Sequence, residues 1–190
     1  MVARAEPDSR EAGWIARVVA HDDHGAFERL VRLHQSPVRL FLRRLTRNDT
    51  ARADDLAQET FWKAYRHIAG FEGRGSFLSW LFRIAYQLFI TEERRRMPGT
   101  VHEELSEDVE DERDEFQALA DRETFDKLIL VLRPEECAAL VLHYRQELTH
   151  PEIADTLGMP VGSIKSLIRR ARQKLIEANS TAGGLNENGL

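Results

Sequence analysis

Side chains that could hold a metal ion or move protons gather at one short run, His21, Asp22, Asp23 and His24. Histidine and carboxylate groups are ligands that zinc and iron accept in proteins. Four consecutive residues cannot all face one ion, however, and no acid–base pair stands out elsewhere. The run also falls at an apparent helix break. We therefore expect a solvated loop there, with no metal, no cofactor and no catalytic residue, so that the protein is not an enzyme.

A different chemistry, the binding of phosphates, is indicated near the C-terminus. Residues 165–174 hold five basic side chains and no acidic one, namely Lys165, Arg169, Arg170, Arg172 and Lys174. Arginine and lysine bind DNA phosphates and the acceptor edge of guanine in the major groove. A merely solvated basic face is the simpler alternative, but it leaves unexplained the capped helix and glycine turn that come directly before. We expect this segment to contact DNA.

The segment before these bases carries the signals of a helix-turn-helix. Thr149 and Glu152 have the spacing of a capping box, and Pro151 falls in the first turn, where its missing N–H does no harm. Gly158 can adopt the left-handed conformation that ends a helix, and Met159-Pro160 then form a short connection to the next helix. This order predicts a DNA-reading motif.

The second helix of this motif is predicted to be amphipathic. At 100° per residue one group of apolar side chains lies within about 60° of a common direction and is expected to be buried: Val161, Ile164, Ile168, Ala171 and Leu175. The residues that point the other way are predicted to face DNA: Gly162, Lys165, Ser166, Arg169, Arg170 and Gln173.

The chain as a whole reads as all-α, with two small helical domains. Apolar residues repeat every three to four positions, and no stretch alternates as a strand would. We expect a first domain over 10–97, with four helices separated by breaks at Pro37, at 46–50 and at the glycines of 70–75. An acidic linker over 98–121 leads to a second domain over 122–178 and a disordered tail over 179–190. The lone Cys137 falls on an apolar helical stripe and is expected in the core.

Two features of the first domain could be functional or structural. The segment DDLAQETFWKAYRHI has an apolar side, whereas its carboxylates near the helix start favour the positive end of the helix dipole, which is simple capping. The following glycine-rich stretch joins aromatic residues to a helix that ends in three arginines, 94–96. Aromatic side chains beside bases suit single-stranded DNA, although Trp80 also fits an ordinary core stripe.

Taken together, these motifs resemble one family. DDLAQETFWKAYR, then F-x-G-x-G-S-F-x-x-W-L-F-R-I-A, an arginine cluster, an acidic linker and EIADTLGMPVGSIKSLIRRARQKL occur in the order found in extracytoplasmic-function sigma factors of the sigma-70 family. The resemblance covers about 14–96, which is similar to region 2, and 123–177, which is similar to region 4. It implies a non-enzymatic protein that directs bacterial core RNA polymerase to promoters. The first residues, MVARAEPDSRE, contain no apolar segment typical of an export signal, so a cytoplasmic protein is expected.

The resemblance also implies roles for individual residues. Core polymerase would be bound by Asp54, Asp55, Gln58 and Glu59. The -10 element would be captured by Phe71, Trp80 and Gln87, and the -35 element would be read by Lys165, Ser166, Arg169, Arg170 and Gln173. Four positions depart from the common pattern, namely Arg52, Gln87, His150 and Leu167.

Partners follow from the same resemblance. They are core RNA polymerase, promoter DNA and an anti-sigma protein that covers the binding faces. A stand-alone helix-turn-helix regulator is the alternative. It would form homodimers on palindromic sites, whereas a sigma factor would be monomeric and would need core enzyme.

The net charge of −5 argues against nucleic acid only while it is averaged over the chain. Residues 103–115 alone hold nine acids and one base, and the rest of the chain has a net charge of +3, with bases concentrated at 29–47, 94–96 and 165–174. We expect the acidic linker to lie in basic channels of polymerase. No apolar run approaches the roughly 18–20 residues that span a bilayer, so no membrane insertion is expected.

Overall fold

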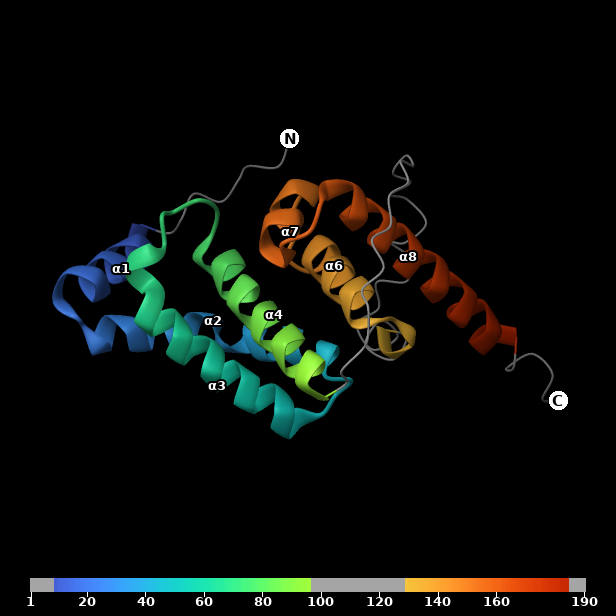
Figure 1. Ribbon diagram of the computed structural model, residues 1–190, viewed down its shortest axis with the longest axis horizontal. Helices are drawn as coiled ribbons and strands as arrows, with labels where there is room; N and C mark the ends of the chain where they lie inside the picture. The colour runs from blue at the N-terminus through green and yellow to red at the C-terminus, as the bar shows by residue number, and fades with distance from the viewer. Residues whose placement is uncertain (1–8, 97–128, 185–190) are drawn as a thin grey trace.

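The computed structural model describes residues 9–96 and 129–184, with side chains through residue 179 (Figure 1). Within these ranges the secondary structure is helical, and no strand occurs. The prediction of an all-α fold is confirmed. The predicted acidic linker lies outside the described residues.

The first domain contains four α-helices, α1 (Ser9–His21), α2 (His24–Leu45), α3 (Thr50–His67) and α4 (Phe77–Arg96), with a short 3-10 turn, η1 (Ile68–Gly70), after α3. Its core is built from fully buried side chains of α2 and α4, where the rings of Phe41 and Phe82 lie 5.0 Å apart. The first helix is held to α2 by the largely buried pair of Glu11 and His34, whose Oε1 and Nε2 atoms are 2.6 Å apart.

The number of helices in this domain was predicted correctly, but the break at Pro37 was not. Pro37 lies inside α2, which begins at His24 and is capped by Asp23, whose Oδ1 accepts a hydrogen bond from the Ala26 N–H at 2.9 Å. A proline within a helix removes one backbone hydrogen bond and costs about 3 kcal/mol. Leu30 and His34 before Pro37, and Val38 and Phe41 after it, are all buried, and this burial on one continuous face offsets the loss.

The second domain contains a 3-10 turn, η3 (Ile129–Val131), and three α-helices, α6 (Pro134–Tyr144), α7 (His150–Leu157) and α8 (Val161–Gly184). The predicted capping box is present, with the Thr149 N–H donating to Glu152 Oε2 at 2.9 Å, and Gly158 ends α7 with a φ of 69°. Cys137 is buried, as predicted. The tail boundary at 179 was wrong, because α8 continues to Gly184.

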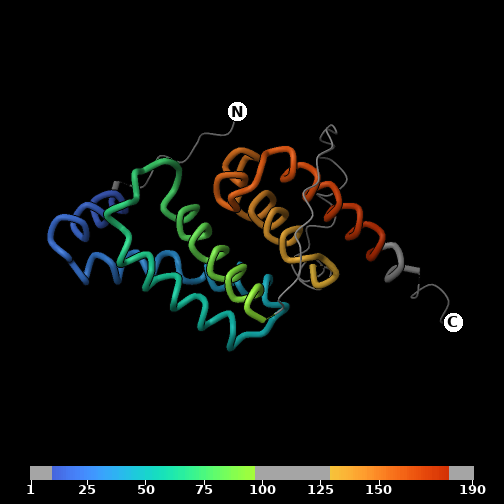
Figure 2. The backbone as a smooth tube through the Cα atoms, in the orientation of Figure 1, coloured from blue at the N-terminus to red at the C-terminus, as the bar shows by residue number. Residues whose placement is uncertain are grey.

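The two domains pack against each other rather than lying apart. Helix α4 contacts α7 and α2 contacts α6, so that the second domain rests on the first, as the backbone tube shows (Figure 2). An ion pair crosses the seam, between Arg83 Nη1 on α4 and Asp155 Oδ1 on α7, at 3.2 Å. This packing brings the start of the helix-turn-helix onto the side of α4.

Candidate nucleic-acid interface

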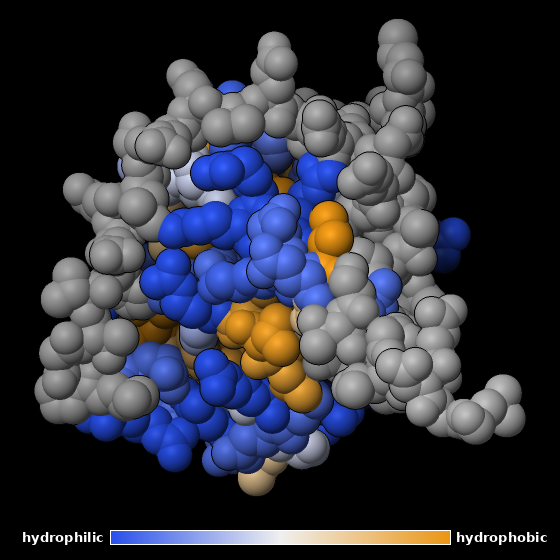
Figure 3. Space-filling model, turned by 90° about the vertical axis from the view of Figure 1, so that its right-hand side faces the viewer, coloured by the Kyte–Doolittle hydropathy of each residue, from blue (hydrophilic) through white to orange (hydrophobic). Residues whose placement is uncertain are grey.

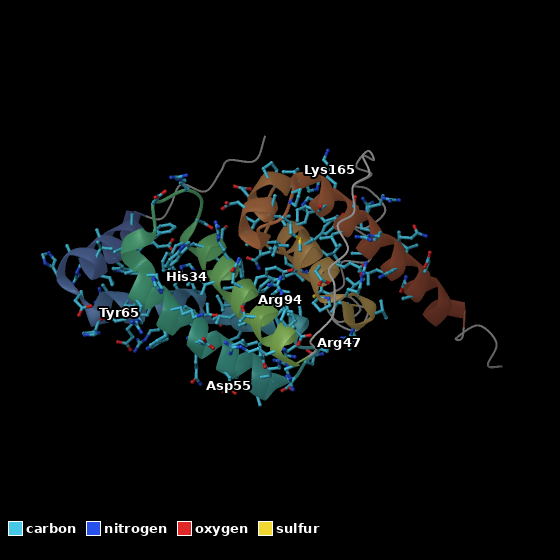
Figure 4. All side chains as sticks on the ribbon, in the orientation of Figure 1. His34, Arg47, Asp55, Tyr65, Arg94 and Lys165 are labelled. Atoms are coloured by element: carbon cyan, nitrogen blue, oxygen red, sulfur yellow. The ribbon has the colours of Figure 1, made fainter. Side chains whose placement is uncertain are left out.

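The basic face predicted on α8 is partly available to a ligand. Lys165, Arg169 and Gln173 are exposed, and Arg170 is half-buried. Lys165 lies at the start of α8, close to α7 (Figure 4). Where Figure 3 shows the described residues of this end of the molecule, the surface is mostly hydrophilic, with hydrophobic side chains visible in several separate places. Exposed basic and polar side chains one and two turns apart on one helix can contact DNA phosphates and the edges of the nucleobases in a groove.

Two residues of α8 are placed differently from the prediction. Val161, expected in the core, is 39% exposed, because it stands at the first position of the helix, at the edge of the packed surface. Ser166, expected to face DNA, is only 5% exposed. Ser166 stands next to Leu167 and Ile168, which are 7% and 3% exposed, so the buried side of α8 is wider than the predicted stripe. Arg170 Nε, one turn later, donates to the Ser166 backbone carbonyl oxygen at 3.3 Å.

Lys174, the last basic residue of 165–174, is paired within the fold and does not belong to the exposed basic face. Its Nζ lies 2.8 Å from both carboxylate oxygens of Glu136, a side chain of α6 that is fully buried. The same carboxylate accepts the Arg133 backbone N–H at 2.9 Å and so caps α6. Burial by itself would raise the pKa of Glu136, but the Lys174 ammonium and the Arg133 N–H outweigh it and hold the pKa below its ordinary value. Lys174 thus ties α8 to α6.

The acidic residues predicted to bind polymerase lie along the first half of α3. Asp55, Gln58 and Glu59 are exposed, and Glu59 Oε1 is 3.7 Å from Lys63 Nζ. Asp54 differs, because both of its oxygens accept hydrogen bonds from Arg39 on α2, at 2.9 and 2.8 Å. The three exposed residues are therefore accessible to a partner, while Asp54 joins two helices. Asp55 and Lys165 lie on opposite sides of the molecule (Figure 4).

The aromatic residues predicted near the -10 element form a compact cluster. The Phe71 ring lies 5.3 Å from Phe77 and 5.5 Å from Trp80, and Phe77 lies 5.4 Å from Trp80. Phe71 and Trp80 are half-buried, whereas Phe77 is fully part of the core. The loop between them is exposed, and Gly73 and Gly75 adopt φ angles of 71° and 85°. Phe71 and Trp80 thus pack against the core and remain partly exposed to solvent.

Gln87, the third residue predicted at the -10 element, is exposed on α4 but stands at the seam between the domains. Its Nε2 lies 3.9 Å from the point that a Cβ on Gly158 would occupy. Arg83, one turn earlier, makes the ion pair with Asp155. The face of α4 that carries Gln87 is thus the face on which α7 rests.

The departures from the common pattern have structural explanations at three positions. Arg52 turns inward, with Nε donating to Glu92 at 2.9 Å, a second hydrogen bond to Glu93, and its guanidinium carbon 5.3 Å from the centre of the Phe89 ring. It holds α3 to α4. Leu167 is 7% exposed and packs in the core, and the His150 ring stacks on His143 at 5.0 Å.

The residues of 21–24 lie where α1 ends and α2 begins, at the predicted helix break, and they have structural partners. Asp23 caps α2 and accepts from Arg17 Nε at 2.9 Å, while the Tyr65 hydroxyl donates to Asp22 and lies 3.2 Å from His24 Nδ1. Over 9–96 and 129–184 no group of three or more His, Cys, Asp or Glu side chains is placed to hold a metal ion. In the same residues no helix is long and apolar enough to cross a bilayer.

Together these features define a helical protein with a helix-turn-helix, an exposed basic recognition helix and a separate acidic face. Comparison with protein families is specific: residues 30–97 match sigma-70 region 2, and residues 122–175 match sigma-70 region 4. The chain is 33% identical to the ECF RNA polymerase sigma-E factor of Haemophilus influenzae, over 83% of this chain and 89% of that protein. It is 30% identical to the ECF RNA polymerase sigma factor SigW of Bacillus subtilis, over 83% of this chain and 90% of that one.

Solved structures agree with these matches. The sigma factor RpoE in complex with the anti-sigma factor NepR from Bartonella quintana has a TM-score of 0.61 and 25% identity, covering 80% of this chain and 94% of that one. CnrH in complex with the cytosolic domain of CnrY has the same fold, with a TM-score of 0.64 and 23% identity, covering 91% of this chain and 99% of that one. The chain belongs to the extracytoplasmic-function class of the sigma-70 family of sigma factors.

Sequence reasoning did not single out Trp62. This side chain of α3 is 55% exposed, and the guanidinium carbon of Arg66 lies 4.7 Å from the centre of its ring. The signal was present in the spacing, because Trp62 follows Asp55, Gln58 and Glu59 by seven, four and three positions and so shares their helix face.

Proposed function

We propose that this sigma factor binds bacterial core RNA polymerase and directs it to promoters by dividing recognition between its two domains. The observation that supports this most strongly is the presence of region 2 and region 4 in one chain, each with an exposed charged face of the sign its partner requires. A stand-alone helix-turn-helix regulator is not favoured, because it has no need of region 2.

The residues assigned to promoter reading follow the exposed surfaces. Region 4 reads the -35 element through Lys165, Arg169, Arg170 and Gln173. Ser166, which is 5% exposed, joins that set only if region 4 rearranges around it. Region 2 captures unstacked bases of the -10 element through Phe71, Trp80 and Gln87, and aromatic rings suit this task because a base stacks on them without regard to sequence.

Core polymerase is bound through Asp55, Gln58 and Glu59 on α3, with Asp54 positioning α3 against α2 through Arg39. The chain itself is not an enzyme and carries no cofactor. It acts in the cytoplasm, where core polymerase and the chromosome are found, and it redirects a catalyst that another protein supplies.

An anti-sigma protein is the proposed regulator. The RpoE relative, 25% identical, is seen in complex with an anti-sigma factor, and the present chain shares its two-domain fold. A protein that covers the exposed acidic face of α3 and the basic face of α8 would block both partners at once.

Gel filtration and affinity capture test this proposal directly. We expect the purified chain to be monomeric and to co-elute with core polymerase in a one-to-one complex. A dimer that binds a palindromic DNA site tightly without core polymerase would contradict the proposal and would favour the stand-alone regulator.

A further inference from the structure

The exposed face of α3 carries one large apolar side chain among its polar residues. Trp62 lies within about 60° of Asp55, Gln58 and Glu59 around the helix axis, at 100° per residue. Those three residues are exposed, and the Trp62 side chain is 55% exposed. The opposite side of α3 packs into the core through Ala53, Leu56, Ala57, Thr60 and Ala64. Trp62 therefore points away from the core, on the same helix face as Asp55, Gln58 and Glu59 and one to two turns after them.

The indole ring is also held in place. The guanidinium carbon of Arg66, one turn later, lies 4.7 Å from the ring centre, in the geometry of a cation–π contact. Lys63, beside Trp62 in sequence, is drawn to Glu59 instead. A ring that is already oriented loses less rotamer freedom when a partner covers it.

A single exposed apolar residue needs no special explanation in general. Trp62 does need one, because it lies on the same helix face as the exposed acidic residues. Energetic centres of protein interfaces are enriched in tryptophan and are bordered by polar residues that exclude water. Trp62 supplies the aromatic side chain, and Asp55, Gln58 and Glu59 supply two carboxylates and an amide beside it on the same helix face.

We propose that Trp62 is the aromatic anchor of the surface that docks on core RNA polymerase. This inference rests on the proposed function. The occupant is the polymerase surface that meets the acidic face of α3, and its chemistry is fixed by that face: an apolar socket for the indole, bordered by basic side chains that pair with Asp55 and Glu59. Charge complementarity orients the encounter, and burial of the ring supplies most of the affinity.

The test measures the affinity of the full chain for core polymerase in three variants. Trp62→Ala removes the ring and is expected to weaken binding on the order of tenfold or more. Trp62→Phe keeps a smaller ring, and we expect its affinity for core polymerase to lie between the affinities of Trp62→Ala and the unchanged chain. Leu33→Ala is the matched control, because Leu33 is an apolar side chain of α2 that is 50% exposed, and we expect its affinity to stay within about twofold of the unchanged chain.

Hydroxyl-radical footprinting adds a reading that a fold defect would not produce. We expect core polymerase to protect Trp62 from oxidation and to leave Leu33 reactive. Thermal unfolding of Trp62→Ala should match that of the unchanged chain, because the ring makes little contact with the core.

The two failures are distinguishable. If the unchanged chain does not bind core polymerase, the proposed function itself is contradicted. If it binds, but Trp62→Ala binds equally well and Trp62 stays reactive in the complex, only the present inference is overturned. Loss of a dimer in Trp62→Ala, with core affinity unchanged, would also overturn it and would identify a second copy as the occupant.

Discussion

At the scale of single residues, charged side chains that look alike in the sequence have different tasks in the fold. Lys165 and Lys174 stand on the same helix, yet Lys165 is exposed while Lys174 pairs with the buried carboxylate of Glu136. Asp54 and Asp55 are neighbours, yet only Asp54 is committed to Arg39. Such assignments decide which substitutions affect stability and which affect recognition.

The pair of Lys174 and Glu136 predicts a specific dependence of stability on pH. The pKa of Glu136 in the folded chain lies below its ordinary value of 4.5. The carboxylate therefore stabilises the fold above about pH 4.5, and this contribution is lost as the pH falls through the folded pKa. We expect Glu136→Gln to lower the free energy of unfolding by about 1–3 kcal/mol at pH 7, and by less in acid.

Urea unfolding between pH 3 and 7 measures this difference. Glu72→Gln is the control, because Glu72 makes an exposed ion pair with Arg74, and such surface pairs contribute about 0–1 kcal/mol. A free-energy difference between Glu136→Gln and the unchanged chain that stays constant across this range would contradict the assignment.

At the scale of helices, local signals in the sequence located the helix-turn-helix well. The Thr149 capping box and the left-handed Gly158 depend on a few neighbouring residues, so the pattern alone predicts them. The continuation of α2 through Pro37 and the burial of Ser166 depend on contacts with other helices. Periodicity contains no information about such contacts, so the predicted break at Pro37 was wrong and Ser166 is buried where an exposed side chain was expected.

Replacing either of two glycines of the helix-turn-helix by alanine is expected to change stability in opposite directions. Gly158 has a φ of 69°, where a side chain is strained by about 1–2 kcal/mol, so Gly158→Ala should lower the melting temperature. Gly162 lies within α8, and a Cβ added there would meet no atom of a neighbouring described residue within 4 Å, so Gly162→Ala should raise stability by about 0.5–1 kcal/mol. Calorimetry of both variants checks the pair, and equal shifts in one direction would contradict the turn geometry.

The basic face of α8 predicts a salt-dependent effect on DNA binding. Lys165→Ala and Arg169→Ala together should weaken binding of the polymerase complex to its promoter. Each lost phosphate contact should reduce the slope of log affinity against log salt by about 1, and a lost guanine contact should cost about 1–3 kcal/mol and relax specificity. Arg17→Ala, on α1, is the control. Titrations at several salt concentrations that show no change for the double variant would refute α8 as the -35 reader.

At the scale of the whole molecule, the two domains share a seam that covers part of the predicted -10 surface. Gln87 lies against the turn that ends α7, and the crossing ion pair of Arg83 and Asp155 is largely exposed, with side-chain exposures of 47% and 74%. The Tyr86 hydroxyl on α4 is buried, and in the part of the chain that the structure describes it has no hydrogen-bond partner. Burial and, to a smaller extent, the charge of Glu135 on α6 raise the pKa of Tyr86, which indicates that the hydroxyl lies on the side of α4 that faces the second domain. An exposed pair and an unsatisfied hydroxyl make this seam one that can open.

Charge reversal at the seam should therefore shift the molecule toward an extended form. We expect Asp155→Arg to increase the radius of gyration measured by small-angle X-ray scattering, because it places two positive charges beside each other. The swap Arg83→Asp with Asp155→Arg should restore the compact value. Asp55→Arg, with the same change in net charge on the opposite side of the molecule, is the control. An unchanged radius for Asp155→Arg would show that the seam is held by other contacts.

We expect this chain to give core RNA polymerase its promoter specificity. Transcription in vitro, with core polymerase and a promoter library randomised at the -35 and -10 elements, measures that specificity. We expect start sites to concentrate at one promoter class only when the chain is present, and the -35 preference to fade with Lys165→Ala plus Arg169→Ala. Transcripts that are no more specific with the chain than with core polymerase alone would contradict the proposed sigma-factor function.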